Sequence, residues 1–308
     1  MPAAVQAVVV TYQPDPALLL EQYHALRGQV ERVVYVDNGG GRQALAEVAD
    51  APDVVLLGSG ENAGLASALN LALARLATEG VEFALLLDQD SLPDPGLVDT
   101  LLRGFTAPRE PEEARRRPGV AAVGPAILDQ LEGRAEYFAR LRLFGNTRIH
   151  SAADVATEFF DVDFLITSGT LLHLPTLADI GPMDEELFID SVDFEWSFRA
   201  RARGYALLAT FSATLRHRRG DDLCHTPLGP LRIHSPSRLY YMHRNRIRLY
   251  RRGYVPIAWK VHDLGRWLVK LALLMMFAPD RRGRLAAVTR GLRDGLRLRG
   301  GLRRRGGP

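Results

Sequence analysis

Residues 84–91 read ALLLDQDS: four apolar residues are followed directly by two acids that stand one residue apart. A continuous apolar run, unlike an alternating one, is typical of a strand buried on both faces of a sheet. Three earlier runs have the same character, at residues 7–11, 33–37 and 54–58. Segments with helical spacing lie between them, at 16–27 and 63–76. Strands that alternate with helices predict a parallel, doubly wound α/β sheet.

The residues that end these runs are expected to share one edge of the sheet. They are Thr11, Asp37, Gly58 and Asp88. Ligands of doubly wound sheets bind beyond the carboxyl ends of the strands, so the pattern predicts a nucleotide-type pocket at this edge. Later in the chain we expect a charged loop at 109–118, strands at 120–124 and 162–167, loops and an edge hairpin at 125–163, and helices at 194–204, 237–252 and 256–278.

Composition excludes several classes of protein. The chain has 308 residues, of which 47% are hydrophobic and 24% charged, as in soluble globular proteins rather than disordered, collagenous or multi-span membrane chains. A single cysteine excludes an internal disulfide and a Cys-based zinc site. The most apolar stretch, 268–278, is about half the ~20 residues of a spanning helix. The first residues lack a basic region and run into a strand, so no signal peptide is expected.

Asp88 and Asp90 form the first group of residues that could carry chemistry. Two carboxylates one residue apart in a turn can face the same hard cation, and Mg²⁺ or Mn²⁺ takes oxygen ligands of this kind. The position directly after a buried strand strengthens this interpretation. The alternative is a surface turn in which the two side chains only cap Ser91 and the following helix.

The second group is acidic and lies about a hundred residues further on: Asp184, Glu185, Glu186, Asp190, Asp193 and Glu195. Asp193 stands just before the helix predicted at 194–204. A helix N-terminus stabilises a carboxylate as the anion, which suits a base. Simple N-capping by Asp190 or Asp193 is the alternative.

His217 is the third candidate, because it follows an apolar, strand-like run at 206–215. A histidine at a strand end can bind a metal through one ring nitrogen. An ordinary structural histidine is the alternative, and the two acids upstream favour the ligand.

The chain resembles the family 2 glycosyltransferases of the GT-A nucleotide-diphospho-sugar transferase fold, and most of all their rhamnosyltransferase branch. The resemblance rests on eight ordered strings: VVVTYQP at 8–14, VDNGG at 36–40, NAGLASALNLAL at 62–73, LLLDQDS at 85–91, VDFLITSGTLL at 162–172, GPMDEELFIDSVDFEWSFRARARGY at 181–205, HRRGD at 217–221 and RLYYMHRNRIRLYRRGY at 238–254. It implies an α/β fold with a doubly wound mixed sheet and a C-terminal helical extension.

The resemblance also implies how a nucleotide binds. Thr11 and Tyr12 would lie beside the base, and Asp37 would accept the N3–H of thymine or uracil. Asn62 and Gly64 would line the nucleoside side, Gly64 because a side chain there would crowd the ligand.

Asp88 and Asp90 would hold Mg²⁺ or Mn²⁺ against the diphosphate, with His217 as the third protein ligand. Asp88 would also contact the nucleotide. Asp193 corresponds to the general base. Val192 stands where many relatives carry an acid, which leaves Asp190 and Glu195 as possible substitutes.

Further residues match the acceptor and sugar sides of the family's site. Glu195 and Trp196 would shape the acceptor side, and Asp190 would support it. The loop near the reacting sugar is matched by Ser168, Gly169 and Thr170. Arg244 and Asn245 are expected to contact the diphosphate or the acceptor.

The implied activity is inverting, metal-dependent transfer of L-rhamnose from dTDP-β-L-rhamnose to a hydroxyl of a glycan, which can be lipid-linked, in the synthesis of cell-surface polysaccharide. A UDP-sugar donor such as UDP-galactofuranose is the alternative within the class. A nucleotidyltransferase is disfavoured because TYQPDP at 11–16 lacks a phosphate-binding loop. A non-catalytic binding protein is disfavoured because both acidic groups are intact, and no nucleic-acid partner is expected.

The expected organisation is a catalytic domain at 1–235, with a nucleotide-binding half at 1–125 and an acceptor half at 126–235, and a helical, basic region at 236–308. Residues 281–308 contain ten arginines and one acidic residue, Asp294. Tryptophans and basic residues on the helix at 256–278 fit an interfacial membrane helix. The protein would be cytoplasmic and peripheral on the inner membrane face. Packing on the catalytic domain, or on a second copy of the chain as a homo-oligomer, is the alternative.

Overall fold

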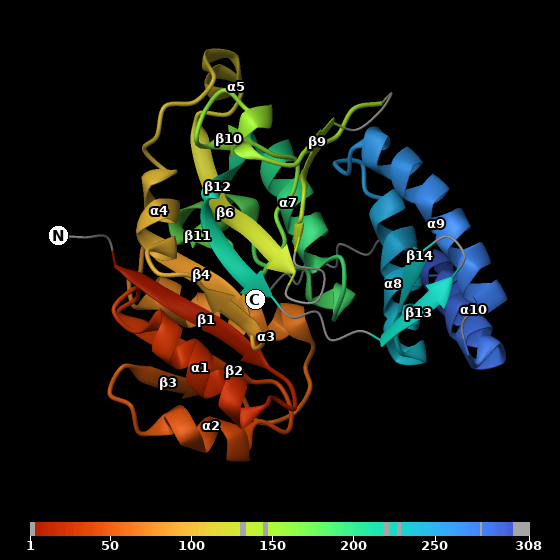
Figure 1. Cartoon of the computed structure of the whole chain (residues 1–308), viewed down its shortest axis with the longest axis horizontal. Helices are drawn as coiled ribbons and strands as arrows, with labels where there is room; N and C mark the ends of the chain where they lie inside the picture. Colours follow the sequence, from red (N-terminus) through yellow and green to blue (C-terminus); the bar gives the residue numbers. More distant parts are fainter. Residues whose placement is uncertain are drawn as a thin grey trace, which may run out of the picture. The chain divides into compact units, whose positions relative to one another are not determined.

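Four parallel strands form the first half of the chain in the computed structural model, which describes residues 4–129, 134–143, 147–217, 222–226, 229–277 and 279–297 (Figure 1). β1 (Val5–Thr11) lies between β2 (Arg32–Asp37) and β4 (Phe83–Asp88), and β3 (Val54–Leu57) pairs with β2. β1 is buried along its whole length. The predicted parallel core is therefore confirmed.

The second half adds antiparallel strands and makes the sheet mixed. Its order is β10-β12-β6-β11-β4-β1-β2-β3. The added strands are β5 (Ser91–Pro93), β6 (Gly119–Asp129), β7 (Arg134–Ala135), β10 (Phe160–Asp161), β11 (Leu171–His173) and β12 (Tyr205–His217). A separate hairpin consists of β8 (Phe138–Arg140) and β9 (Thr147–Ile149). The expected hairpin forms, but as a sheet of its own rather than at the edge of the main sheet, and β6 extends to Asp129, past the predicted strand end at 124.

Two of the expected elements are wrong. Residues 162–167 form no strand: the Val162 N–H still donates to the Leu207 carbonyl at 2.9 Å, but the chain then leaves the sheet, and the Leu165 N–H donates to the Ser197 hydroxyl at 3.3 Å. The charged loop at 109–118 contains the helix α5 (Pro111–Arg116), because Pro111 suits the first helical position and acids follow it in the first turn.

Helices cover the sheet and connect its strands (Figure 1). α1 begins at Pro16, with the Asp15 carboxylate accepting the Ala17 N–H as an N-cap. The α-helices of this half are α1 (Pro16–Leu26), α2 (Arg42–Ala49), α3 (Leu65–Thr78), α4 (Leu97–Arg103), α5, α6 (Leu177–Ile180) and α7 (Val192–Ala202), and the short 3₁₀ turns are η1 (Ala152–Asp154), η2 (Leu174–Thr176) and η3 (Glu185–Leu187).

The core lies between the sheet and these helices. Its fully buried side chains come from neighbouring strands and the helices above them, among them Leu19, Tyr35, Leu85, Leu87 and Leu101. Burying one leucine or valine side chain stabilises the fold by about 1.5–3 kcal/mol. The strands are thereby held in register up to their carboxyl ends, where the polar residues begin.

The chain divides into two compact units. The first comprises residues 1–188 and 192–220, and the second comprises 189–191 and 221–308. The predicted boundary at residue 235 differs, because the hairpin of β13 (Asp222–Thr226) and β14 (Gly229–Ile233) groups with the second unit. The predicted halves 1–125 and 126–235 share one sheet.

The second unit is helical, as expected, with α8 (Pro236–Tyr250), α9 (Ile257–Phe277) and α10 (Arg281–Arg297). α10 approaches α8 closely through glycines: a Cβ at Gly291 would lie 2.4 Å from the Tyr240 carbonyl oxygen. None of the described helices is long and apolar enough to span a membrane. Part of the predicted basic tail, 298–308, lies outside the described residues.

Candidate functional site

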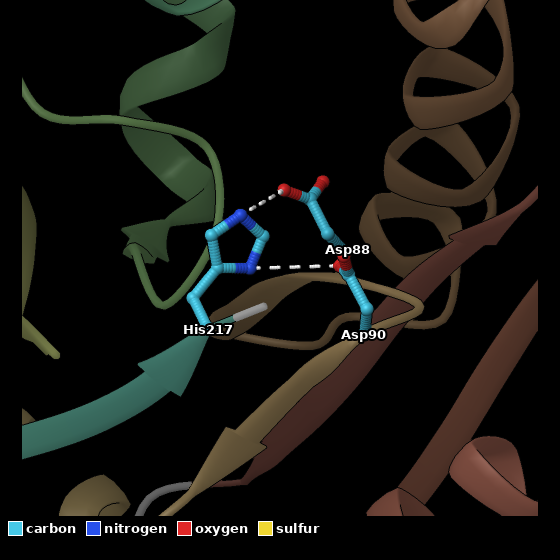
Figure 2. A group of neighbouring side chains, drawn as sticks. All are labelled: Asp88, Asp90 and His217. Atoms are coloured by element: carbon cyan, nitrogen blue, oxygen red, sulfur yellow. Dashed lines mark ion pairs between the residues drawn. The ribbon is translucent and has the colours of Figure 1, made fainter. Parts of the chain in front are cut away.

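Asp88, Asp90 and His217 meet at one edge of the sheet (Figure 2). Asp88 ends β4, and Asp90 lies in the turn that leads to β5. β5 pairs antiparallel with β12, which places His217 opposite Ser91. His217 Nε2 lies 4.0 Å from Asp88 Oδ2, and His217 Nδ1 lies 3.5 Å from Asp90 Oδ1. The strand pairing therefore brings together the three predicted ligands.

This donor set fits a divalent cation. One ligand atom from each of the three residues lies within 4.8 Å of the others. Carboxylate oxygens suit Mg²⁺ and Mn²⁺, and an imidazole nitrogen is a common ligand of transition-metal ions. The three side chains would hold the ion at the end of β4, beside the strand ends that form the predicted pocket.

Gln22 of α1 fixes the turn that carries the two acids. Its side chain is fully buried, and Nε2 donates to the Asp88 carbonyl at 2.8 Å and to the Ser91 carbonyl at 2.7 Å. Within the turn, the Gln89 side chain binds both the N–H and the carbonyl of Tyr12. The turn is thus tied to α1 and to the end of β1.

A chain of hydroxyl groups connects His217 to β4. Ser91 Oγ lies 2.9 Å from His217 Nδ1 and 2.6 Å from Ser168 Oγ, and Ser168 Oγ accepts the Asp88 N–H at 3.1 Å. When Nδ1 carries the ring proton and donates it to Ser91, the Nε2 lone pair is available for a cation. Metal-binding histidines are usually oriented in this way through their second nitrogen.

The predicted base-binding residues lie at the ends of β1 and β2. Asp37 Oδ1 accepts the N–H groups of Gly39 and Gly41, each at 3.0 Å. The Tyr12 side chain is 48% exposed. Thr11 is fully buried and donates to the Val36 carbonyl at 3.2 Å. Tyr12 and Asp37 can therefore face a ligand, whereas Thr11 has a structural contact.

Asn62 and Gly64 lie in the loop before α3. Asn62 Oδ1 accepts the Gly64 N–H at 3.1 Å. Gly64 has a φ of 90°, and a Cβ there would lie 2.5 Å from the Phe188 ring. The backbone conformation and the close approach of Phe188 give a structural reason for this glycine. The predicted reason, crowding of a ligand, stays a prediction.

Asp193 lies in the first turn of α7, which begins at Val192, two residues earlier than expected. Its side chain is partly buried, and Oδ1 accepts the Phe194 N–H at 2.8 Å. The N–H groups of a first helical turn favour a negative charge. This position favours a negative charge on the carboxylate, and the role of Asp193 as a general base stays a prediction.

The acids considered as substitutes are both engaged by arginines. Glu195 is fully buried, and both its oxygens bind Arg199, at 2.9 and 2.8 Å. Asp190 is paired with Arg238 at 3.1 Å. Trp196 is also buried and donates to the Gly181 carbonyl. These contacts are structural, and a role of the three residues on the acceptor side stays a prediction.

The Ser168–Thr170 loop braces the metal-side turn. Ser168 and Thr170 are buried, and the Gly169 N–H donates to the Leu86 carbonyl at 2.7 Å. The loop borders a small cavity of about 50 Å³, whose wall includes Pro125, Phe138 and Phe164. Contact of this loop with a sugar stays a prediction.

Arg244 and Asn245 lie on α8, in the second unit. Asn245 is fully buried, and both N–H groups of its amide donate to backbone carbonyls, those of Ile189 and Asp190. Both N–H groups of the amide are thus used within the protein, and contact of Asn245 with a diphosphate or an acceptor stays a prediction.

Sequence reasoning missed Gln22, Gln89 and Arg238. Each is one polar residue whose partners are far away in the chain. Gln22, for example, binds carbonyls 66 and 69 residues later. The signal that the sequence offers for Gln22 is its place on the apolar side of a predicted helix, among Leu19, Tyr23 and Leu26.

Comparison with known proteins agrees with this arrangement. Residues 7–110 match the family described as Glycosyl transferase family 2. The dTDP-rhamnosyl transferase RfbF of Shigella flexneri is 28% identical over 278 residues, which cover 89% of each chain.

Two solved structures share the fold. GalNAc-T7 with UDP, GalNAc and Mn²⁺ superposes with a TM-score of 0.60 and 12% identity over 96% of this chain, which spans 56% of that longer protein. The S. aureus TarS 1–349 complex with UDP-GlcNAc has a TM-score of 0.53 and 14% identity, over 94% of this chain and 81% of its own. The mixed sheet, with its Asp-x-Asp turn after β4, therefore has the GT-A fold. The chain is thus similar to glycosyltransferase family 2 over residues 7–110 and to one dTDP-rhamnosyl transferase along most of its length.

Replacing Ser91 by alanine tests the orientation of His217. Without the Ser91 hydroxyl, the ring loses the partner that fixes its Nδ1 proton, and removal of such a partner typically costs about 10–100-fold in metal affinity. We expect a loss of this size for Mn²⁺, measured by electron paramagnetic resonance of the free ion with dTDP present.

Ser212→Ala, at an exposed position on the same strand as His217, is the control and should bind Mn²⁺ like the native protein. Equal affinities of Ser91→Ala and native protein would contradict a role of Ser91 in holding the ligand.

Proposed function

We propose that this enzyme transfers L-rhamnose from dTDP-β-L-rhamnose, with Mg²⁺ or Mn²⁺, to a hydroxyl of a glycan acceptor in the synthesis of cell-surface polysaccharide. The observation that carries the proposal is the group Asp88, Asp90 and His217, placed at the strand ends of a GT-A fold. The choice of donor rests on the similarity to a dTDP-rhamnosyl transferase along 89% of the chain.

The nucleotide is proposed to bind between Tyr12 and Asp37. The exposed Tyr12 ring offers a stacking face for a base. Asp37 Oδ1 is occupied by two backbone N–H groups, while Oδ2 receives no hydrogen bond from the described residues. Oδ2 can therefore accept the N3–H of a pyrimidine. Thymine and uracil both carry this proton, so this contact selects pyrimidines without distinguishing dTDP from UDP.

The diphosphate is proposed to lie at the turn of Asp88 and Asp90. These residues and His217 would hold the cation, which would neutralise charge on a departing nucleoside diphosphate. Gln22 and Ser168 keep the turn in place before the donor arrives. Little reorganisation is then required when the leaving group becomes charged.

Asp193 is proposed as the general base. Its carboxylate takes the proton of the acceptor hydroxyl while that oxygen attacks the anomeric carbon of the donor. A new bond forms between this carbon and the acceptor oxygen, and the bond to the diphosphate oxygen breaks with its electron pair. One displacement from the opposite face inverts the configuration, so a β-L-rhamnosyl donor yields an α-L-rhamnoside.

A UDP-sugar donor, such as UDP-galactofuranose, is the second candidate. It is favoured by one observation only: Asp37 offers the same acceptor to uracil and to thymine. It would use the same cation site and the same base.

Donor turnover combined with an Asp193→Asn variant tests the proposal. We expect native protein with Mn²⁺ to hydrolyse dTDP-L-rhamnose slowly and to leave UDP-galactofuranose, UDP-glucose and GDP-mannose intact. Asparagine keeps the shape of Asp193 but cannot take a proton, so turnover should fall by about 10²–10⁴, with donor binding retained. Released dTDP measures the first quantity, and the thermal shift caused by the donor measures the second.

Preference for a UDP-sugar would overturn the rhamnosyl assignment, and unchanged turnover in the variant would remove Asp193 as the base. Glu185→Gln serves as the control, since this exposed acid lies on the same segment, in η3, eight residues away.

We further propose that the second unit binds anionic lipid and so brings the enzyme to a lipid-linked acceptor on the cytoplasmic face of the membrane. Exposed apolar side chains recur along α9 at helical spacing, at Ile257, Val261, Leu264 and Leu268. Exposed cations accompany them, including Arg266 and Lys270 on α9 and Arg281, Arg282 and Arg290 on α10. Each basic residue near an anionic surface contributes about 1 kcal/mol.

Vesicle flotation tests this proposal. We expect native protein to float with vesicles that contain phosphatidylglycerol and to stay at the bottom with pure phosphatidylcholine. A Val261→Glu, Leu268→Glu variant should lose the interaction but keep donor hydrolysis. Native protein that never floats would contradict the proposal, and a loss of dimers in the variant would assign the same face to a second copy of the chain.

A further inference from the structure

The segment that leads into α7 has an unusual backbone. Phe188, Asp190 and Ser191 have φ angles of 64°, 62° and 65°. Residues other than glycine rarely adopt such angles, and they persist only where the surrounding structure determines them. Some contact must therefore hold residues 188–191, immediately before the helix that carries Asp193.

Asn245 supplies two of these contacts. Its Nδ2 donates to the Ile189 carbonyl at 2.8 Å and to the Asp190 carbonyl at 2.9 Å. The amide is itself fixed, because Oδ1 accepts two hydrogen bonds from Arg244, each 3.0 Å long. The Arg244 guanidinium lies 4.7 Å from the centre of the Tyr241 ring. Because the buried amide uses both its oxygen and its N–H groups in hydrogen bonds, it cannot rotate freely and holds the two consecutive carbonyls in place.

Arg238 supplies a third contact, from the same side of α8. Its guanidinium binds the Asp190 carboxylate, with Nη2 3.1 Å from Oδ1 and Nε 3.2 Å from Oδ2. Arg238 and Asn245 are seven residues apart, which is two helical turns, so they lie on one face of α8. These contacts explain why residues 189–191 group with the second unit although both flanking segments group with the first.

We infer that Asn245 and Arg238 are positioning residues for the transfer reaction. They hold residues 189–191, and Asp193 follows only two residues later, in the first turn of α7. The backbone of residues 189–191 sets where this turn begins, and hence where the Asp193 carboxylate stands. The inference rests on the proposed function of Asp193 as the base, and it gives the second unit a part in catalysis besides any contact with lipid.

The test is Asn245→Asp, which keeps the shape of the side chain but replaces both donated hydrogens by a carboxylate that repels the two carbonyls. A shift of about 1 Å in a reacting group can cost 10²-fold in rate. We expect kcat for metal-dependent hydrolysis of the donor to fall by roughly this factor. KM for the donor should be nearly unchanged, because the residues proposed to bind its cation and its pyrimidine lie on other elements.

Arg238 provides a second, milder set of variants. Arg238→Lys keeps a positive charge for Asp190, and Arg238→Gln removes it. We expect kcat to be restored in part by lysine and to be lower in the glutamine variant, with KM again close to the native value. Equal kcat for native protein and Arg238→Gln would contradict the role of this ion pair.

The matched control is Gln29→Glu, the same change of amide to carboxylate. Gln29 also donates to two backbone carbonyls, those of Ala25 and Asp94, but near the start of β2 rather than at the strand ends of the site. Urea unfolding measures the stability of each variant. Asn245→Asp that unfolds normally and retains native kcat would overturn the inference, as would an equal fall of kcat in Gln29→Glu.

Hydrogen exchange separates this inference from the proposed function. Asn245→Asp should raise exchange in residues 189–193 more than in the rest of α7, and unchanged exchange there would overturn the inference even if no donor is turned over. Absence of turnover of every nucleotide sugar by native protein would instead contradict the proposed function.

Discussion

Two hydrogen bonds from one buried amide hold the turn on which the site depends. Gln22 joins the Asp88 and Ser91 carbonyls, and these residues bracket Gln89 and Asp90. A buried polar group without a partner costs about 1–3 kcal/mol, so any other shape of the turn is disfavoured. The Ser91 hydroxyl in turn contacts the ring of His217, and the strand of His217 pairs with β5. The three ligands are thus arranged by the fold before a donor binds.

The parallel core and its functional edge could be predicted, because burial on both faces leaves an unbroken apolar run in the sequence. Asp37 and Asp88 end such runs, and the structure places both at the carboxyl edge. His217 was a candidate because it follows an apolar, strand-like run, but its place beside the two acids depends on the pairing of β12 with β5. That pairing joins residues 126 positions apart and leaves no local pattern.

Other features could not be predicted, for reasons of the same kind. An acidic sequence does not distinguish Glu195, which is buried against Arg199, from Asp193, which is only partly buried. An apolar run shows burial but not pairing, so residues 162–167 were mistaken for a strand. Gln22 and Asn245 bind backbone carbonyls, which every residue possesses, and no residue type marks the partner.

The dependence of donor binding on the cation is the quantity to measure. Calorimetric titration of dTDP-L-rhamnose into native protein, with Mn²⁺ and then with EDTA, tests the three-ligand site, and Asp90→Asn tests one ligand of it. We predict one binding site with Mn²⁺, and a large loss of affinity with EDTA and in the variant. Equal affinity under all three conditions would contradict a site in which Asp88, Asp90 and His217 hold the cation against the diphosphate.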